Sequence, residues 1–169
     1  SVVRSEAEDT FAEGLVISRD EPNVAISIET LRLKDLRPRD GGGFIASEIE
    51  MTGGGVRSDV IDASIPSAAL WNLAMPSLAG VPLAPKHLMT STSRFYTVAA
   101  DGALDELKIP EVLYTHRQPV AGTDQSIEMQ ARYSDISMTE LSDGVLRHQE
   151  VGPTSISSQG PGDEKFEFK

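Results

Sequence analysis

Three Asp-Gly pairs, each followed by a short run of alternating apolar and polar residues, most constrain what this chain can fold into. The pairs are Asp40-Gly41, Asp101-Gly102 and Asp143-Gly144. Asp and Gly tolerate the positive φ angles of tight hairpin turns, so each pair marks a place where a strand folds back. The pattern therefore predicts an antiparallel β protein.

Runs with period-two alternation indicate strands that bury one side and expose the other. We expect such strands at residues 11–18, 24–33, 44–51, 56–65, 88–99, 104–109, 112–116, 126–136, 145–151, 154–158 and 166–169. Gly53-Gly54-Gly55 is expected to be a flexible break between two of them. One-sided strands argue against a parallel sheet. The predicted fold is all-β, an antiparallel meander that forms a curved sheet or a sandwich.

One segment, near residues 66–75, is expected to be a short helix. It runs from Pro66 to Ala74, Ser64 or Ser67 would cap it, and Pro76 stops its continuation. We expect this helix to close one end of the sheet with Leu70, Trp71 and Leu73.

The length of 169 residues predicts one domain. We expect residues 1–10 to be a polar arm and residues 11–169 to be a single β-rich domain. A start at Ser rather than Met indicates a processed chain or a piece of a longer one. Because aromatic residues make up only 5% of the chain, the core must be built from aliphatic side chains, which suits a thin sheet.

The net charge of −11 disfavours nucleic acid and anionic membrane surfaces as partners. The chain has no cysteine, which excludes disulfides, thiolate metal sites and cysteine nucleophiles. No apolar run approaches the roughly 20 residues that span a bilayer. These features fit a periplasmic or secreted protein, and the cytosol stays open as an alternative.

No residue pattern specifies a chemistry. His87, His116 and His148 lack metal-ligand spacing, and acidic groups such as Asp101, Asp105 and Glu106 lack the density of a calcium loop. A nucleophile turn of the Gly-x-Ser-x-Gly type is missing. Neither Gly41-Gly42-Gly43 nor Gly53-Gly54-Gly55 is followed by the Lys-Ser or Lys-Thr of a phosphate loop. The sequence predicts no metal site, no cofactor and no catalytic residue.

The apolar sides of three strands are the candidate ligand-binding surface. Their residues are Val24, Ile26, Ile28, Ile45, Ile49, Ile127, Met129 and Tyr133. A twisted meander that does not close leaves an apolar concavity, which a ligand can fill. The alternative is that these residues form an ordinary sandwich core.

Two segments carry a family resemblance. The segment Tyr133–Val151 and the segment Leu33–Ile49, each with an Asp-Gly turn between strands, resemble the repeating strand–turn–strand units of AsmA-type bacterial envelope proteins. The resemblance implies a periplasmic protein with a curved β-groove whose apolar inner face holds acyl chains.

Three functions follow as hypotheses. The first is a non-enzymatic binding or scaffolding module of a bacterial cell envelope, which holds lipid or another apolar ligand. The second is a sandwich or jelly-roll carbohydrate-binding or hydrolase domain that uses Trp71 or Tyr96. The third is a structural subunit that assembles through edge strands such as Phe166–Lys169.

Overall fold

The structure is a computed structural model that describes residues 2–6, 9–19, 23–77, 101–120, 122–123, 125–160 and 165–168, and the side chains of all of these but 5, 6, 19 and 165–168. The strand predicted at 88–99, the connector after 77, His87 and Tyr96 lie outside the described residues. Every regular element in the described part is a strand. The strands are β1 (Val2–Glu6), β2 (Asp9–Arg19), β3 (Val24–Lys34), β4 (Arg37–Pro38), β5 (Gly43–Ser58), β6 (Ile61–Pro76), β7 (Leu104–Pro119), β8 (Ser126–Ser142), β9 (Val145–Glu150), β10 (Thr154–Gln159) and β11 (Lys165–Phe168).

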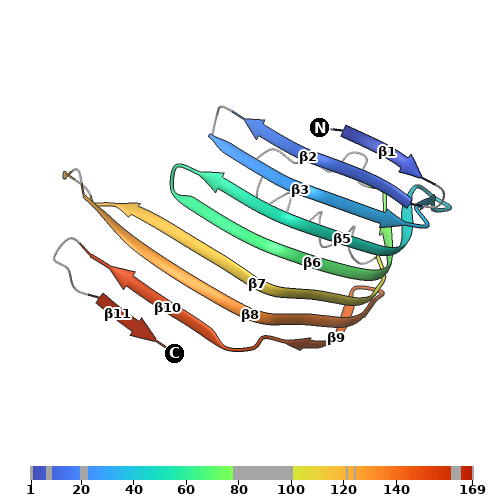
Figure 1. Ribbon diagram of the computed structural model, residues 1–169. Coiled ribbons are helices and arrows are strands. Elements are labelled where there is room, and N and C mark those ends of the chain that lie inside the picture. The colour runs from blue at the N-terminus through green and yellow to red at the C-terminus, as the bar shows by residue number, and fades with distance from the viewer. Residues whose placement is uncertain are drawn as a thin grey trace.

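All the strands belong to one open antiparallel meander. The order across the sheet is β1-β2-β3-β5-β6-β7-β8-β10-β11, with the short β4 paired to β5 and β9 paired to β8. Neighbours in sequence are therefore neighbours in space, and β1 and β11 form the two edges (Figure 1). The prediction of an all-β antiparallel meander is confirmed. The described strands form a single curved sheet.

The Asp-Gly pairs have different roles. Asp143 and Gly144 have φ angles of 51° and 71° and join β8 to β9 in a two-residue hairpin, as predicted. Asp40 and Gly41 lie in the loop between β4 and β5. Asp101-Gly102 is not the turn of a tight hairpin. It precedes Ala103, which bridges to Ala74 near the end of β6, and β7 itself pairs with β6 and β8.

The helix predicted near residues 66–75 is wrong, because these residues lie in β6. They pair with β5 on one side, from Thr52↔Ser67 to Gly43↔Pro76, and with β7 on the other. A helix this short is marginal in water. Ladder hydrogen bonds to two long neighbours therefore outweigh the helix propensity of its alanines and leucines.

The flexible break predicted at Gly53-Gly54-Gly55 is also wrong, because β5 runs through it. Gly53 has a φ of +60°, and a Cβ there would lie 2.3 Å from Cγ of Glu29. The glycine therefore lets the strand kink while it stays paired. The segment expected to be a polar arm includes β1, which pairs with β2 from Val2↔Glu13 to Glu6↔Asp9.

Two lines of left-handed backbone cross the sheet, and we name them creases. The central crease includes Gly14 of β2, Gly53 of β5 and Asp135 of β8, and the terminal crease includes Asp35 after β3, Asn72 of β6 and Glu140 of β8. The pairing skips each such position but resumes in the same register. Glu13 pairs with Thr30 and Leu15 with Ile28, for example, with no pair between them. The creases therefore bend the strands without inserting a residue.

At each crease the apolar positions shift by one residue. In β3 they are Val24, Ile26 and Ile28 before the central crease, then Leu31 and Leu33 after it. A Cβ at Gly54 would lie 2.8 Å from the Met51 methyl carbon, so positions three apart point to the same side across this crease. One side of the sheet therefore carries mostly apolar residues before and after the crease.

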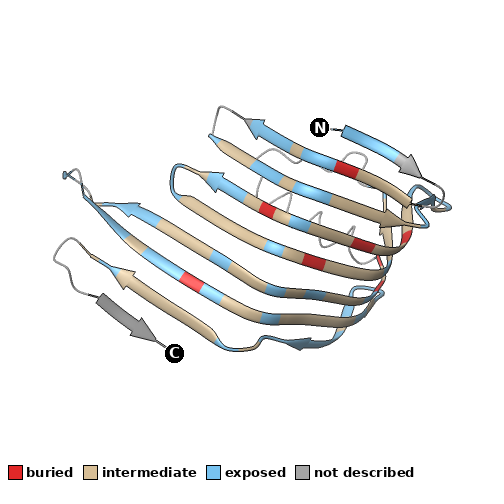
Figure 2. Ribbon diagram, viewed as in Figure 1, coloured by how far each residue is buried: buried red, intermediate tan, exposed pale blue. Residues whose placement is uncertain are grey.

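We call this side the apolar face. All six buried hydrophobic residues of the described part belong to it, namely Ala12, Ala46, Ile49, Ala68, Leu104 and Ala131. Figure 2 shows the buried positions, in red, scattered singly among half-buried and exposed positions of the strands. The packing of the described strands thus leaves most of the apolar face incompletely covered.

Candidate functional site

The opposite side, which we call the polar face, carries the ion pairs of the sheet. Arg32 donates to Asp9 at 2.7 Å and to Glu50 at 3.2 Å, and the pKa of Arg32 is raised chiefly by the bond to Asp9. Further pairs on this face join Arg57 to Asp62, Arg117 to Glu128 and Arg132 to Glu111. The pairs range from half-buried to exposed, so water screens them and they contribute little to stability. They keep the polar face hydrated.

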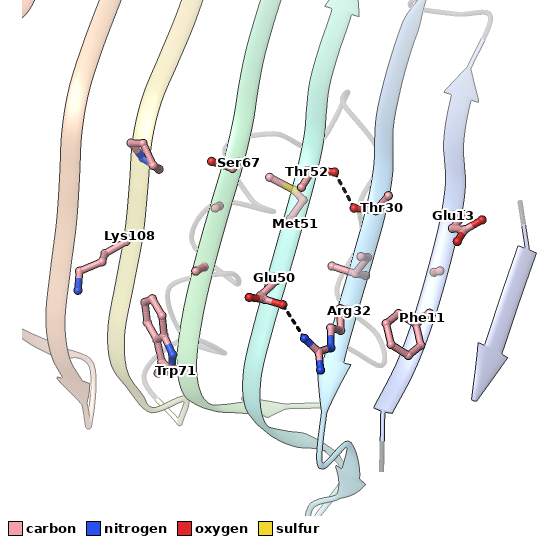
Figure 3. A pocket seen from close by; sticks show the side chains of 15 residues that line it. Phe11, Glu13, Thr30, Arg32, Glu50, Met51, Thr52, Ser67, Trp71 and Lys108 are labelled. Carbon is pink, nitrogen blue, oxygen red and sulfur yellow. Dashed lines mark hydrogen bonds and ion pairs between the residues drawn. The ribbon is translucent and has the colours of Figure 1, made fainter. Parts of the chain in front are cut away.

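A shallow hollow of about 620 Å³ lies on the polar face (Figure 3). Thr30, Thr52 and Ser67 contribute small side chains to it, and Trp71 and Phe11 lie at its two ends. Lys108 Nζ lies 5.3 Å from the centre of the Trp71 ring, and the guanidinium groups of two arginines, Arg4 and Arg32, lie 5.3 and 5.7 Å from the Phe11 ring. Cation–π contacts thus already engage both aromatic rings.

The hollow contains Trp71, one of the two aromatic residues that the carbohydrate hypothesis names. Its two carboxylates, Glu13 and Glu50, form ion pairs with Arg4 and Arg32. Hydrolysis of a glycoside needs one carboxyl group that stays protonated beside a second that is ionised. In the described structure each of the two carboxylates is instead engaged by its own arginine.

The apolar face is the larger feature, and the register assembles it from distant parts of the chain. One continuous row of paired positions crosses seven strands: Ile17, Ile26, Val56, Ala63, Tyr114, Ala131 and Ile156. Paired residues in antiparallel strands point to the same side, so this row is a band of apolar side chains. Several of them are strongly solvent-exposed, with Ile17 at 71%, Ile26 at 41% and Val56 at 39%.

Seven of the eight predicted ligand residues lie on the apolar face. Six of them, on the β2–β3 hairpin side of the central crease, are Val24, Ile26, Ile28, Ile127, Met129 and Tyr133. Ile49 lies on the same face beyond that crease and is 7% exposed. Ile45 is the exception: it precedes the buried Ala46 in β5 and therefore points to the polar face.

Sequence reasoning missed Tyr114, His116, Val56 and Ile156, which lie on the apolar face between or beside the predicted residues. The alternation of Val112, Tyr114 and His116 is the signal that identifies two of them. The sequence alone does not place Val56 on this face. Val56 follows Gly53-Gly54-Gly55, and the crease at Gly53 shifts the apolar positions of β5 by one residue.

The apolar face carries no acidic, lysine or arginine side chain in the described part of the chain. Among the side chains that the structure describes, none of its positions is Asp, Glu, Lys or Arg, and its titratable groups are Tyr114, His116 and Tyr133. The described residues hold no cluster of three or more potential metal ligands. His148 lies on the polar face, where it contacts Glu150 at 3.1 Å. In the described part, no helix has the length and hydropathy of a membrane span.

The geometry defines a class of protein: an open, creased antiparallel sheet with one charged face and one uncharged apolar face. Comparison of the chain with protein-family models, with curated proteins and with solved structures gave no match.

Proposed function

We propose that this chain is a non-enzymatic binding module that holds a lipid acyl chain or a similar apolar ligand against the apolar face of its sheet. The observation that carries the proposal is the continuous band from Ile17 to Ile156, in which Ile17, Ile26 and Val56 are solvent-exposed in the described structure. Burying apolar surface contributes about 25 cal/mol per Å², so this band favours an apolar partner over water. A module that shields acyl chains suits a bacterial cell envelope, the location that the family resemblance implies.

We expect Ile26→Glu to weaken ligand binding by at least about tenfold. The substitution places an unpaired carboxylate in the middle of the band, where an apolar ligand would strip it of water. Binding can be measured by the fluorescence of N-phenylnaphthylamine, an uncharged apolar probe, and by native mass spectrometry of the gently purified protein.

Val16→Glu is the matched control for this experiment. Val16 lies on the neighbouring strand, is 65% exposed and points to the polar face, so the same change there should leave probe binding intact. Equal probe binding by wild type and Ile26→Glu, or a wild-type protein that binds neither probe nor copurifying lipid, would contradict the proposed function.

A second candidate function is assembly through the sheet edges. In the described part, β1 pairs only with β2 and β11 only with β10, so each edge has unpaired backbone groups. The two edge strands run in the same direction, because eight antiparallel pairings, an even number, lead from β1 to β11. Antiparallel addition would therefore join like edges in a symmetric dimer. Light scattering across a concentration series should show that dimer, and a monomer at every concentration would exclude it.

A further inference from the structure

The apolar face has a small polar region on β7 and β8. Tyr114 and His116 alternate along β7, and their side chains contact each other: the Tyr114 hydroxyl lies 3.4 Å from Nδ1 of His116, and the rings meet edge to face at 6.5 Å. Tyr133 lies diagonally opposite on β8, two residues from the partner of Tyr114. These three rings, with Thr154 opposite Tyr133 on β10, place hydrogen-bonding atoms beside the hydrocarbon side chains of the band.

Small residues leave space beside the central ring. Tyr114 pairs with Ala63 of β6 on one side and with Ala131 of β8 on the other. An alanine beside a tyrosine covers little of the ring, so the ring stands above its neighbours and remains half-buried. A ligand lying in the band can therefore reach the Tyr114 hydroxyl from either side.

The hydrogen-bonding capacity of this region is not filled. Tyr133 has no hydrogen-bond partner among the described residues, and His116 there bonds only to Tyr114. A phenol can donate and accept, and a neutral imidazole does both through different nitrogens. The region therefore suits a hydroxyl, ester or amide group of a ligand.

The rest of the apolar face indicates that the other part of the ligand is hydrocarbon. From Tyr114 towards Leu107, β7 presents only hydrocarbon on this face, with Val112 and Ile109 between them, over roughly 24 Å. The face carries no Lys, Arg, Asp or Glu among the described side chains. A charged ligand group buried there would lose its water without gaining an acidic or strongly basic partner, which disfavours its binding.

We infer that the ligand is an uncharged amphiphile. Its hydrogen-bonding group lies against Tyr114, His116 and Tyr133, and its hydrocarbon chain runs along β7 and β8 towards Leu107 and Met138. The inference rests on the proposed function, because it gives the orientation and the polar group of the ligand bound at the same face.

Displacement of N-phenylnaphthylamine by three ligands of equal chain length tests the inference. Decanol carries an uncharged hydrogen-bonding group, decane carries none, and decanoate is ionised at slightly alkaline pH. Decanol should displace the probe best and decanoate worst. Tyr114→Phe and Tyr133→Phe should each weaken decanol binding about 3- to 10-fold, the effect of one neutral hydrogen bond, and leave decane unchanged.

Thr115→Val is the matched control, because it removes a hydroxyl from the same strand on the polar face and should change nothing. Equal displacement by decanol and decane with no effect of either phenylalanine variant would overturn the inference and leave the proposed function intact. Tight binding of decanoate would overturn it as well. Failure of the probe to bind the wild type would instead overturn the proposed function.

Discussion

Gly43→Ala should destabilise the protein by about 3 kcal/mol, through backbone strain and a steric clash together. Gly43 begins β5 with a φ of +93°, and it pairs with Pro76 at the end of β6. A Cβ at Gly43 would lie 2.1 Å from the Met75 carbonyl oxygen and 2.6 Å from the Pro76 carbonyl carbon. Both are backbone atoms of a paired strand, so they cannot rotate out of the way as a side chain would.

Gly41→Ala is the control that separates strain from clash. Gly41 has a similar φ of +83°, but a Cβ there would meet nothing within 4 Å. It should therefore cost only about 1 kcal/mol. Urea unfolding, followed by the fluorescence of Trp71, measures the free energy of unfolding of both variants. In a thermal melt, the expected difference of about 2 kcal/mol between them would lower the melting temperature of Gly43→Ala by roughly 5 °C relative to Gly41→Ala. Equal losses would show that β5 and β6 do not approach as closely as described.

Asn72→Val should cost about 2–3 kcal/mol, because Asn72 lies in the terminal crease with a φ of +50°. A β-branched residue is strained in the left-handed region, whereas Asn tolerates it. The variant also loses the hydrogen bond from Nδ2 of Asn72 to Oδ2 of Asp105, 2.6 Å long and exposed. Denaturant unfolding monitored by circular dichroism gives the loss directly.

Two further variants at this crease isolate the backbone contribution. Asp105→Val removes the same hydrogen bond at a position without positive φ, so it should cost about 1 kcal/mol or less. Asn72→Gly relieves the strain and loses the bond, so its stability should stay within about 1 kcal/mol of the wild type. If Asn72→Val costs no more than Asp105→Val, the crease does not depend on left-handed backbone.

The creases explain which sequence expectations failed. Unbroken alternation from Phe44 to Met51 predicts that Ile45 and Ile49 lie on one side of β5. The terminal crease shifts the pattern, so that Ala46 and Ile49, three residues apart, are both buried. A shift of one residue exchanges the faces of a strand, so a small error in phase reassigns every side chain beyond it.

Two other expectations failed because neighbouring strands, which lie far away in the sequence, decide the local structure. Residues 66–75 have helical propensity as an isolated segment, but β5 and β7 offer ladder hydrogen bonds on both sides. The glycine triplet of β5 resembles a linker, although Gly53 is needed for a kink opposite Glu29. Neither the pairing partners nor the line of the crease can be detected within one short window of sequence.

Local patterns alone determined the class of the fold, most strand positions and the Asp143-Gly144 hairpin, because alternation and turn propensity act between residues close in the chain. The pairing of β6, the creases and the single uncharged apolar face were decided only by the tertiary structure. These features depend on which residues of separate strands lie opposite each other, and that register is set by hydrogen bonds between segments far apart in sequence.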